Sequence, residues 1–130
     1  MSPEQALGEP LDERTDIYSL GAVAWFLATG RAPFEDSNPL KVIVAHAQEV
    51  PPPASELNAA IPTELDSVIA QCLEKRPQDR PHSAQELKHL LQNMPLTTGW
   101  SAADAAEWWT CHGCPHKRQL DAAVLAGHLE

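Results

Sequence analysis

The sequence has few of the features that mark nucleic-acid-binding, secreted or membrane proteins. Its 130 residues contain 9 lysines and arginines against 18 aspartates and glutamates, which gives a formal net charge of −9. Nucleic-acid-binding surfaces have the opposite balance, so we expect no nucleic-acid partner. No apolar run approaches the roughly 20 residues that cross a bilayer, and the first residues lack the basic and apolar segments of a signal peptide. We therefore expect a cytoplasmic protein with no membrane partner.

Cysteine is also scarce, with three residues in the chain. An odd number does not suit a disulfide scaffold and fits a reducing compartment. Cys72 falls on an apolar helical stripe, where we expect a core residue. Cys111 and Cys114 form a Cys-x-x-Cys pair, and such turns can supply two zinc ligands, with His116 and His128 as the remaining pair. The pattern is half of a zinc site, so we expect no bound metal, and zinc or a disulfide stay as alternatives.

What the chain does contain is helical periodicity, with 43% hydrophobic residues to form a core. Strand-like alternation lasts only a few residues anywhere, so we predict an all-α fold with about four helices and a short helical C-terminal tail. The division falls at Pro95, which gives a domain over residues 1–94 and a tail over 95–130. The predicted helices run from about Asp16 to Thr29, onward from Pro39 with Ser37 or Asn38 as cap, from Leu65 to Leu73, and after Ser83.

Several burial predictions follow from this periodicity. The helix at 16–29 is apolar on nearly every side, so other elements must enclose it, and Trp25 and Phe26 are expected in the core. The helix after Pro39 is expected to bury Leu40 and Val44, among others. Ser83 and Glu86 have the spacing of a reciprocal capping box. In the tail, Ser101 and Asp104 begin a helix, residues 111–117 form a turn, and 120–129 form a last short helix.

Five short motifs follow one another in a distinctive order. They are Ser2-Pro3-Glu4; Asp16 with Tyr18, Ser19 and Gly21; Gly30 with Pro33 and Phe34; Leu73, Lys75 and Pro77; and Arg80-Pro81. Together these motifs resemble the C-terminal, helical lobe of bacterial-type Ser/Thr protein kinases, from the end of the activation segment onward. The resemblance covers residues 1–94 and implies a kinase C-lobe-like helical domain.

The resemblance also implies structural roles for four residues. Glu4 would form a buried ion pair with Arg80, which ties the activation segment to the base of the lobe. Asp16 would hydrogen-bond the backbone of the catalytic loop, and Gly21 belongs to the start of the central buried helix. We expect none of these residues to be catalytic.

The parts that carry out phosphoryl transfer are missing from the sequence. Kinases need a Gly-rich loop, a strand lysine paired with a helix glutamate, a catalytic aspartate, and metal-binding Asp and Asn residues. The sequence contains no His-Arg-Asp, Asp-Phe-Gly or Gly-x-Gly-x-x-Gly motif. The resemblance implies a parent that uses ATP and Mg²⁺ to phosphorylate protein Ser or Thr, whereas we expect this chain to hold no cofactor and to be non-catalytic.

Two explanations of such a chain stay open. It is a piece of a longer kinase that begins at an internal methionine, or a non-catalytic protein-interaction module derived from a kinase lobe. In the first case its partners are protein substrates or the missing remainder of the kinase. Without that remainder, the apolar helix at 17–28 would expose one flank, and we expect self-association or poor solubility.

Overall fold

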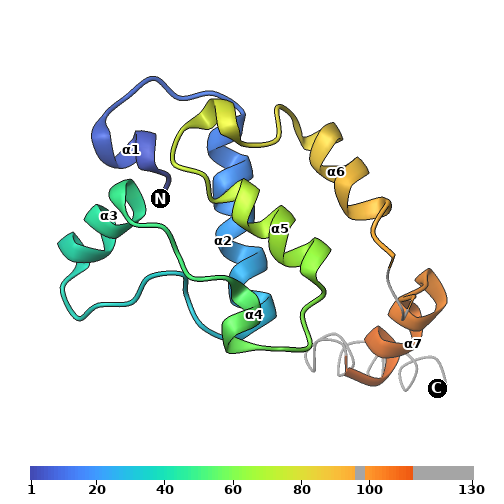
Figure 1. The fold of residues 1–130 in the computed structure, drawn as a ribbon. Helices are drawn as coiled ribbons and strands as arrows, with labels where there is room; N and C mark the ends of the chain where they lie inside the picture. Colours follow the sequence, from blue (N-terminus) through green and yellow to red (C-terminus); the bar gives the residue numbers. More distant parts are fainter. Residues whose placement is uncertain (96–98, 113–130) are drawn as a thin grey trace, which may run out of the picture. The chain divides into compact units, whose positions relative to one another are not determined.

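A computed structural model describes residues 1–95 and 99–112, and all regular structure in these ranges is helical (Figure 1). The all-α prediction is therefore confirmed for the described residues. The chain divides into two compact units, Met1–Met94 and Pro95–Glu130. No described helix is both long enough and apolar enough to cross a membrane. The elements are α1 (Pro3–Leu7), α2 (Arg14–Thr29), α3 (Pro39–Gln48), α4 (Ala54–Leu57), α5 (Thr63–Cys72), the 3₁₀ helix η1 (Pro77–Asp79), α6 (Ala84–Gln92) and α7 (Ala102–His112).

Helix α2 is the centre of the first unit, and α4 and α5 pack against it while α1 packs against α3 (Figure 1). The main core cluster joins Tyr18 and Trp25 of α2 to residues of α4, α5 and the loop that follows α5. Each large apolar side chain buried in this way contributes about 1.5–3 kcal/mol. The buried members of the cluster are Tyr18, Trp25, Ala54, Ile69 and Leu73.

Gly21 sets the distance between α2 and α5. A Cβ atom at this position would lie 2.6 Å from the Cβ of Cys72 and 3.3 Å from Cγ of Leu73. Contacts of 2.6 Å between carbon atoms are repulsive, so any larger residue would push the two helices apart. Glycine is therefore required here for packing.

The predicted helices are present, and the side-chain caps of α3 and α6 follow the sequence signals, whereas α2 and α5 begin without a side-chain cap. Asn38 accepts a hydrogen bond from the backbone N–H of Leu40 at 3.0 Å, and Ser83 accepts one from Glu86 at 3.2 Å. One detail of the prediction is wrong, because the Glu86 carboxylate accepts from the N–H of His82 at 2.7 Å instead of completing a reciprocal box with Ser83. The stripe on α5 is confirmed, with Cys72 in the core.

Three short elements were not predicted. Helix α1 precedes the first predicted helix, and Ser2 and Gln5 form a reciprocal capping box around its first turn. Gly8, with φ of 69°, ends it. The Ser-Pro-Glu-Gln sequence carried this signal, since proline is favoured in the first turn of a helix. The other two elements, α4 and η1, are single turns and are too short for periodicity to reveal.

Three burial predictions are wrong. Phe26 is 53% exposed, Leu40 is 69% exposed and Val44 is 50% exposed. On α3 the buried residue is Ala45. Helical periodicity shows which residues share a face, but a face is buried only where another element covers it.

In the second unit, α7 begins at Ala102, directly after Ser101, as predicted. The Ser101 hydroxyl accepts a hydrogen bond from the N–H of Asp104 at 3.1 Å, and the Asp104 carboxylate accepts one from the N–H of Ser101 at 2.7 Å. Cys111 and His112 lie in the last turn of α7, so the predicted turn does not begin at residue 111. Cys114, His116, His128 and the predicted helix at 120–129 lie outside the described residues. Within the described ranges, no group of three metal-binding side chains comes together.

Candidate functional site

Arg80 is the centre of a buried polar junction in the first unit. Its side chain is inaccessible to solvent, and each of its five N–H groups donates a hydrogen bond. Nη1 and Nη2 each reach one carboxylate oxygen of Glu4 at 2.8 Å. The other three donors bind the backbone carbonyls of Arg14, Glu74 and Lys75. A guanidinium can be buried at tolerable cost only when its donors are satisfied in this way.

Glu4, on α1, is the partner that balances this charge. Its side chain is 2% exposed, and the Thr15 hydroxyl donates a further hydrogen bond to Oε1 at 2.7 Å. Burial by itself raises the pKa of this carboxyl, but hydrogen bonds from Arg80 and Thr15 and the positive charge of Arg80 outweigh it, so that the pKa is lowered to about 2. Glu4 is therefore ionised at any physiological pH. The expected pair between Glu4 and Arg80 is present in the structure.

Tyr18 extends the junction toward α3. The guanidinium carbon of Arg80 lies 4.9 Å from the centre of its ring, within cation–π range. Its hydroxyl lies 2.8 Å from Nδ1 of His46. Burial raises the pKa of Tyr18 to about 12, and burial together with the charges of the N-terminal amine and Lys75 lowers the pKa of His46 to about 4. Both groups are therefore uncharged at neutral pH, and the tyrosine hydroxyl also donates to the backbone carbonyl of His46 at 3.4 Å.

Lys75, in the loop after α5, contacts the junction at His46 and Tyr18. Its ammonium donates to the carbonyl of His46 at 3.0 Å and lies 4.9 Å from the ring centre of Phe34 and 5.6 Å from that of Tyr18. Burial first, then the charge of Arg80, lowers the pKa of Lys75 to about 8. The contact between Lys75 and His46 could not be predicted from the sequence, because 29 residues separate them and one histidine forms no periodic pattern.

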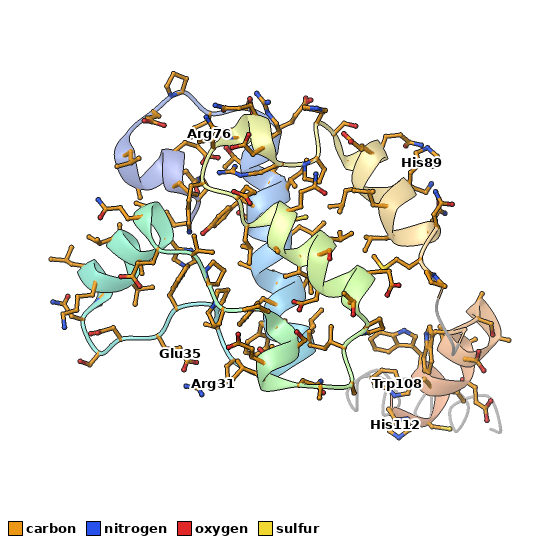
Figure 2. All side chains as sticks on the ribbon, viewed as in Figure 1. Arg31, Glu35, Arg76, His89, Trp108 and His112 are labelled. Carbon is orange, nitrogen blue, oxygen red and sulfur yellow. The ribbon has the colours of Figure 1, made fainter. Side chains whose placement is uncertain are left out.

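The junction contrasts with the arginines at the surface. Arg76 pairs with Asp79 at 2.7 Å, and Arg31 pairs with Glu35 at 2.8 Å, but the arginine side chains are 71% and 63% exposed (Figure 2). Exposed pairs of this kind contribute little to stability because water screens them. The buried junction instead fixes α1, the start of α2 and the loop at 73–80 to one another. Its chemistry is that of a structural tie, since all donors of Arg80 are occupied.

The other two predicted residues lie apart from the junction. Gly21 is buried against Cys72, as described above. Asp16 is exposed in the first turn of α2, where its charge favours the helix N-terminus. No described residue represents the catalytic loop that the resemblance assigns to Asp16, so that role stays a prediction.

Asp16 stands at one end of an uncovered stripe of α2, which we call the open face and define by Leu20, Val23, Phe26 and Leu27. These side chains are 51%, 52%, 53% and 78% exposed. A groove of about 470 Å³ between α2 and α6 continues this surface through Leu20. Helix α2 is thus enclosed on one side and exposes a flank on the other, as we expected if the neighbours that would enclose it lie outside this sequence. Contiguous exposed apolar side chains of this kind are typical of a contact site.

Comparison with known proteins agrees with this geometry. The protein kinase domain family matches residues 1–91. A probable serine/threonine-protein kinase of Clostridium acetobutylicum is 43% identical over 94 residues, which cover 72% of this chain and 14% of that protein. The kinase PksC of Streptomyces coelicolor is 43% identical over 88 residues, which cover 68% of this chain and 16% of that protein.

A third relative, the kinase PknB of Mycolicibacterium smegmatis, is 42% identical over 88 residues, which are 68% of this chain and 14% of that kinase. The chain therefore spans about one seventh of the length of the relatives it matches. The matched region contains the whole Glu4–Arg80 junction and the open face of α2. On this match, the chain belongs to the protein kinase domain family.

Proposed function

We propose that this chain supplies part of the helical lobe of a Ser/Thr protein kinase and carries no phosphoryl-transfer activity by itself. The observation that supports the proposal best is the Glu4–Arg80 pair, in which a residue of the first helix is held by an arginine 76 positions away. Such a tie positions the segment after the activation loop against the base of the lobe. In the family, that segment borders the surface where protein substrates bind.

The chemistry of phosphoryl transfer supports the non-catalytic part of the proposal. Transfer from ATP requires groups that cradle the phosphates, hold Mg²⁺ and orient the attacking hydroxyl. The motifs that supply these groups are absent from the 130 residues. ATP and Mg²⁺ would then be bound by the remainder of the kinase, which we place in the cytoplasm, with protein Ser or Thr as the substrate.

The open face of α2 and the adjacent groove offer a surface for that remainder. Leu20, Val23 and Leu27 lie on one stripe of the helix, and Asp16 lies on the same stripe one turn earlier. The apolar side chains provide buried area, while the exposed carboxylate provides a hydrogen-bond acceptor for backbone N–H groups. A catalytic loop packed against this surface would cover the apolar side chains and donate backbone N–H groups to the Asp16 carboxylate.

A chimeric kinase tests the proposal. The 94-residue segment of the Clostridium acetobutylicum kinase that matches this chain would be replaced by the corresponding residues of this chain. We expect the chimera to incorporate labelled γ-phosphate into a protein substrate, and the 130-residue chain alone to give no incorporation above blank. Arg80→Ala should abolish the chimera's activity, while Arg76→Ala should leave it near that of the unmodified chimera. A folded but inactive chimera, or activity of the chain alone, would contradict the proposal.

The second candidate function is that of a non-catalytic interaction module. The observation in its favour is the same open face, which is available to a protein other than the rest of a kinase. The two functions predict different results for the chimera. A module that has diverged to bind another protein would fail to restore kinase activity, and it would form a stable heterocomplex whose assembly depends on Leu20 and Leu27.

A further inference from the structure

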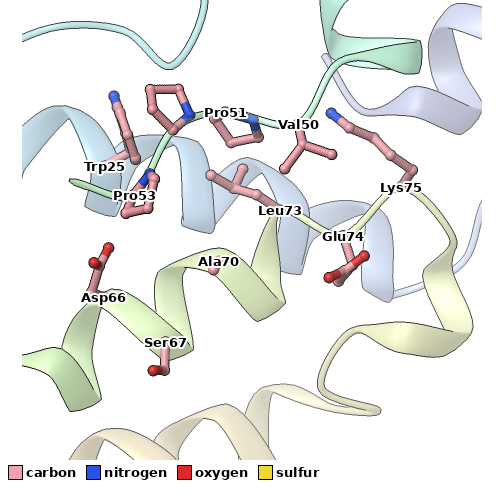
Figure 3. A pocket seen from close by; sticks show the side chains of 11 residues that line it. Trp25, Val50, Pro51, Pro53, Asp66, Ser67, Ala70, Leu73, Glu74 and Lys75 are labelled. Atoms are coloured by element: carbon pink, nitrogen blue, oxygen red, sulfur yellow. The ribbon is translucent and has the colours of Figure 1, made fainter. Parts of the chain in front are cut away.

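Two pockets of the described structure differ in the charges that line them. The pocket between α2, α5 and residues 50–53 has a volume of about 350 Å³ (Figure 3). Charges of both signs line it, since Lys75 lies there with Asp66 and Glu74. Asp66 already accepts two hydrogen bonds and Lys75 already donates one. This pocket therefore favours neither a cation nor an anion.

The pocket on α7, within the second unit, has a different character. Its volume is about 260 Å³, which is smaller than most sites for drug-sized molecules and suits a smaller ligand. Both of its acidic side chains, Asp104 and Glu107, are carboxylates without a nearby cation in sequence, because residues 99–112 contain no lysine or arginine. Its other described lining residues are Trp100, Trp108, Cys111 and His112.

The two tryptophans of this pocket are open to solvent. Trp100 is 68% exposed and Trp108 is 43% exposed, so a ligand reaches them without any movement of the chain. The Trp108 ring stacks on that of His112, with 5.2 Å between the ring centres (Figure 2). It also meets the ring of Trp109 at 5.0 Å and nearly at a right angle. These contacts hold Trp108 in place before a ligand arrives.

The carboxylates give the pocket a negative charge. Asp104 accepts hydrogen bonds from the N–H and the hydroxyl of Ser101, and these bonds lower the pKa of its carboxyl. Asp104 is therefore ionised at neutral pH. Glu107 lies about one turn further along α7, and no hydrogen bond or ion pair joins its side chain to another described residue. The Glu107 carboxylate is thus available to a cationic ligand.

Rings and carboxylates together favour a weakly hydrated organic cation. Indole is the aromatic group that attracts cations most strongly. A primary ammonium is compact and strongly hydrated, and the ring faces offer its N–H groups no acceptors comparable to water. A trimethylammonium group has no N–H and spreads its charge over its methyl groups, so it loses less when rings replace water. An anion would be repelled by both carboxylates.

We propose that the pocket on α7 binds a small quaternary ammonium compound, with its methyl groups against Trp100 and Trp108 and its charge near Asp104 and Glu107. This site is independent of phosphoryl transfer and of the surface proposed for the rest of the kinase.

Choline and 3,3-dimethylbutan-1-ol form a matched pair of probes, because they have the same shape and the alcohol has a neutral carbon in place of the charged nitrogen. Each would be titrated into the full 130-residue chain at constant ionic strength. Saturation-transfer NMR follows the methyl signal of the probe and does not depend on the oligomeric state of the protein. We expect saturable binding of choline. The neutral alcohol should bind about five- to thirtyfold more weakly, since it loses cation–π contacts with two exposed rings.

Substitutions of exposed side chains locate the site without disturbing the core. Trp108→Leu should weaken choline binding by about two- to fivefold, the range for one cation–π contact at an exposed site. Trp109→Leu is the control, because Trp109 is exposed and does not line the pocket. Glu107→Gln should weaken the binding of choline and leave that of the alcohol unchanged. Glu64→Gln, at an exposed position of α5, should affect neither probe.

The trimethylammonium group occurs both in free solutes and in lipid headgroups, so phosphatidylcholine vesicles form a second arm. We expect no cosedimentation with them, because the carboxylates repel the phosphate beside the ammonium. Cosedimentation that Trp108→Leu removes would instead identify the headgroup as the source of the same group.

Three results would overturn the proposal. The first is the absence of saturable choline binding, and the second is equal affinity for choline and the neutral alcohol. The third is an equal loss of binding in Trp108→Leu and Trp109→Leu, which indicates non-specific association with exposed tryptophans.

Discussion

At the scale of single residues, the buried junction depends on complete pairing. All five N–H groups of Arg80 donate hydrogen bonds, and Glu4 accepts from Nη1 and Nη2 of Arg80 and from the Thr15 hydroxyl. Replacing a whole buried pair by apolar residues can be neutral, but removing one partner leaves the other charge buried without compensation. The junction therefore makes each of its two charged residues sensitive to substitution.

We expect Arg80→Ala to lower the free energy of unfolding by about 3–5 kcal/mol, because Glu4 would remain buried without its counter-ion. Urea denaturation followed by circular dichroism measures this change. Arg76→Ala is the matched control, since Arg76 belongs to the neighbouring exposed pair and its loss should shift the midpoint much less. Equal midpoints for the two variants would show that the junction does not stabilise the fold.

The pKa values of Glu4 and His46 predict a two-stage loss of stability in acid. In both cases the folded pKa lies below the unfolded one, so the unfolded state binds more protons and stability falls as pH falls. The His46 contribution is lost from pH 6.5 to about 4, and the Glu4 contribution from pH 4.5 to about 2.

Urea midpoints measured across this pH range in the unmodified chain, His46→Gln and Glu4→Gln would separate the two stages. We expect His46→Gln to flatten the upper stage, and Glu4→Gln to flatten the lower one. A profile that is the same in all three proteins would contradict the assignment.

At the scale of elements, the contact between α2 and α5 depends on Gly21. Glycine in the middle of a helix costs about 1 kcal/mol relative to alanine, so an exposed Gly→Ala change would stabilise the helix. Here the added Cβ would lie 2.6 Å from the Cβ of Cys72. Because both atoms belong to the first positions of their side chains, neither can rotate away.

We therefore expect Gly21→Ala to lower the free energy of unfolding by about 1–3 kcal/mol, the usual cost of overpacking, despite its better helix propensity. Thermal and urea unfolding measure the change. Val23→Ala, on the open face of the same helix, is the control and should cause a smaller change. A Gly21→Ala protein as stable as the unmodified chain would show that α5 adjusts without cost.

The elements also show how far sequence could predict this fold. The helices α2, α3, α5 and α6 were predicted because each has enough turns to show a helical period, and in α3 and α6 a cap residue supports it. Helix α4 could not be found, because its single turn is capped from a distance: Asp66 accepts from the N–H of Ala54 at 2.8 Å. That partner, 12 residues further along the chain, is brought near by tertiary structure alone.

At the scale of the whole molecule, the open face of α2 leaves one side of the central helix of the first unit uncovered. Leu20, Val23, Phe26 and Leu27 are all about half exposed or more. The hydrophobic effect favours covering such a surface with protein. A second copy of the chain is available for this when the chain is alone in solution.

We accordingly expect the isolated chain to elute in size-exclusion chromatography with light scattering as dimers, larger oligomers or aggregates. Replacing Leu20 and Leu27 by lysine should shift it toward the monomer. The double change Leu40→Lys and Val44→Lys, at exposed apolar positions of α3, is the control and should have a smaller effect. A monodisperse monomer of the unmodified chain would rule out self-association through this face.

The sequence by itself determined the helical class, the main helices, the caps of α3 and α6, and the motif order that placed the chain among protein kinases. These features depend on local spacing, which is present in the chain before it folds. Tertiary structure alone decided which apolar faces are covered, that Tyr18 meets His46, and that Gly21 meets Cys72. Burial and long-range contacts require a neighbouring element, and a periodic pattern specifies a face without specifying the neighbour that covers it.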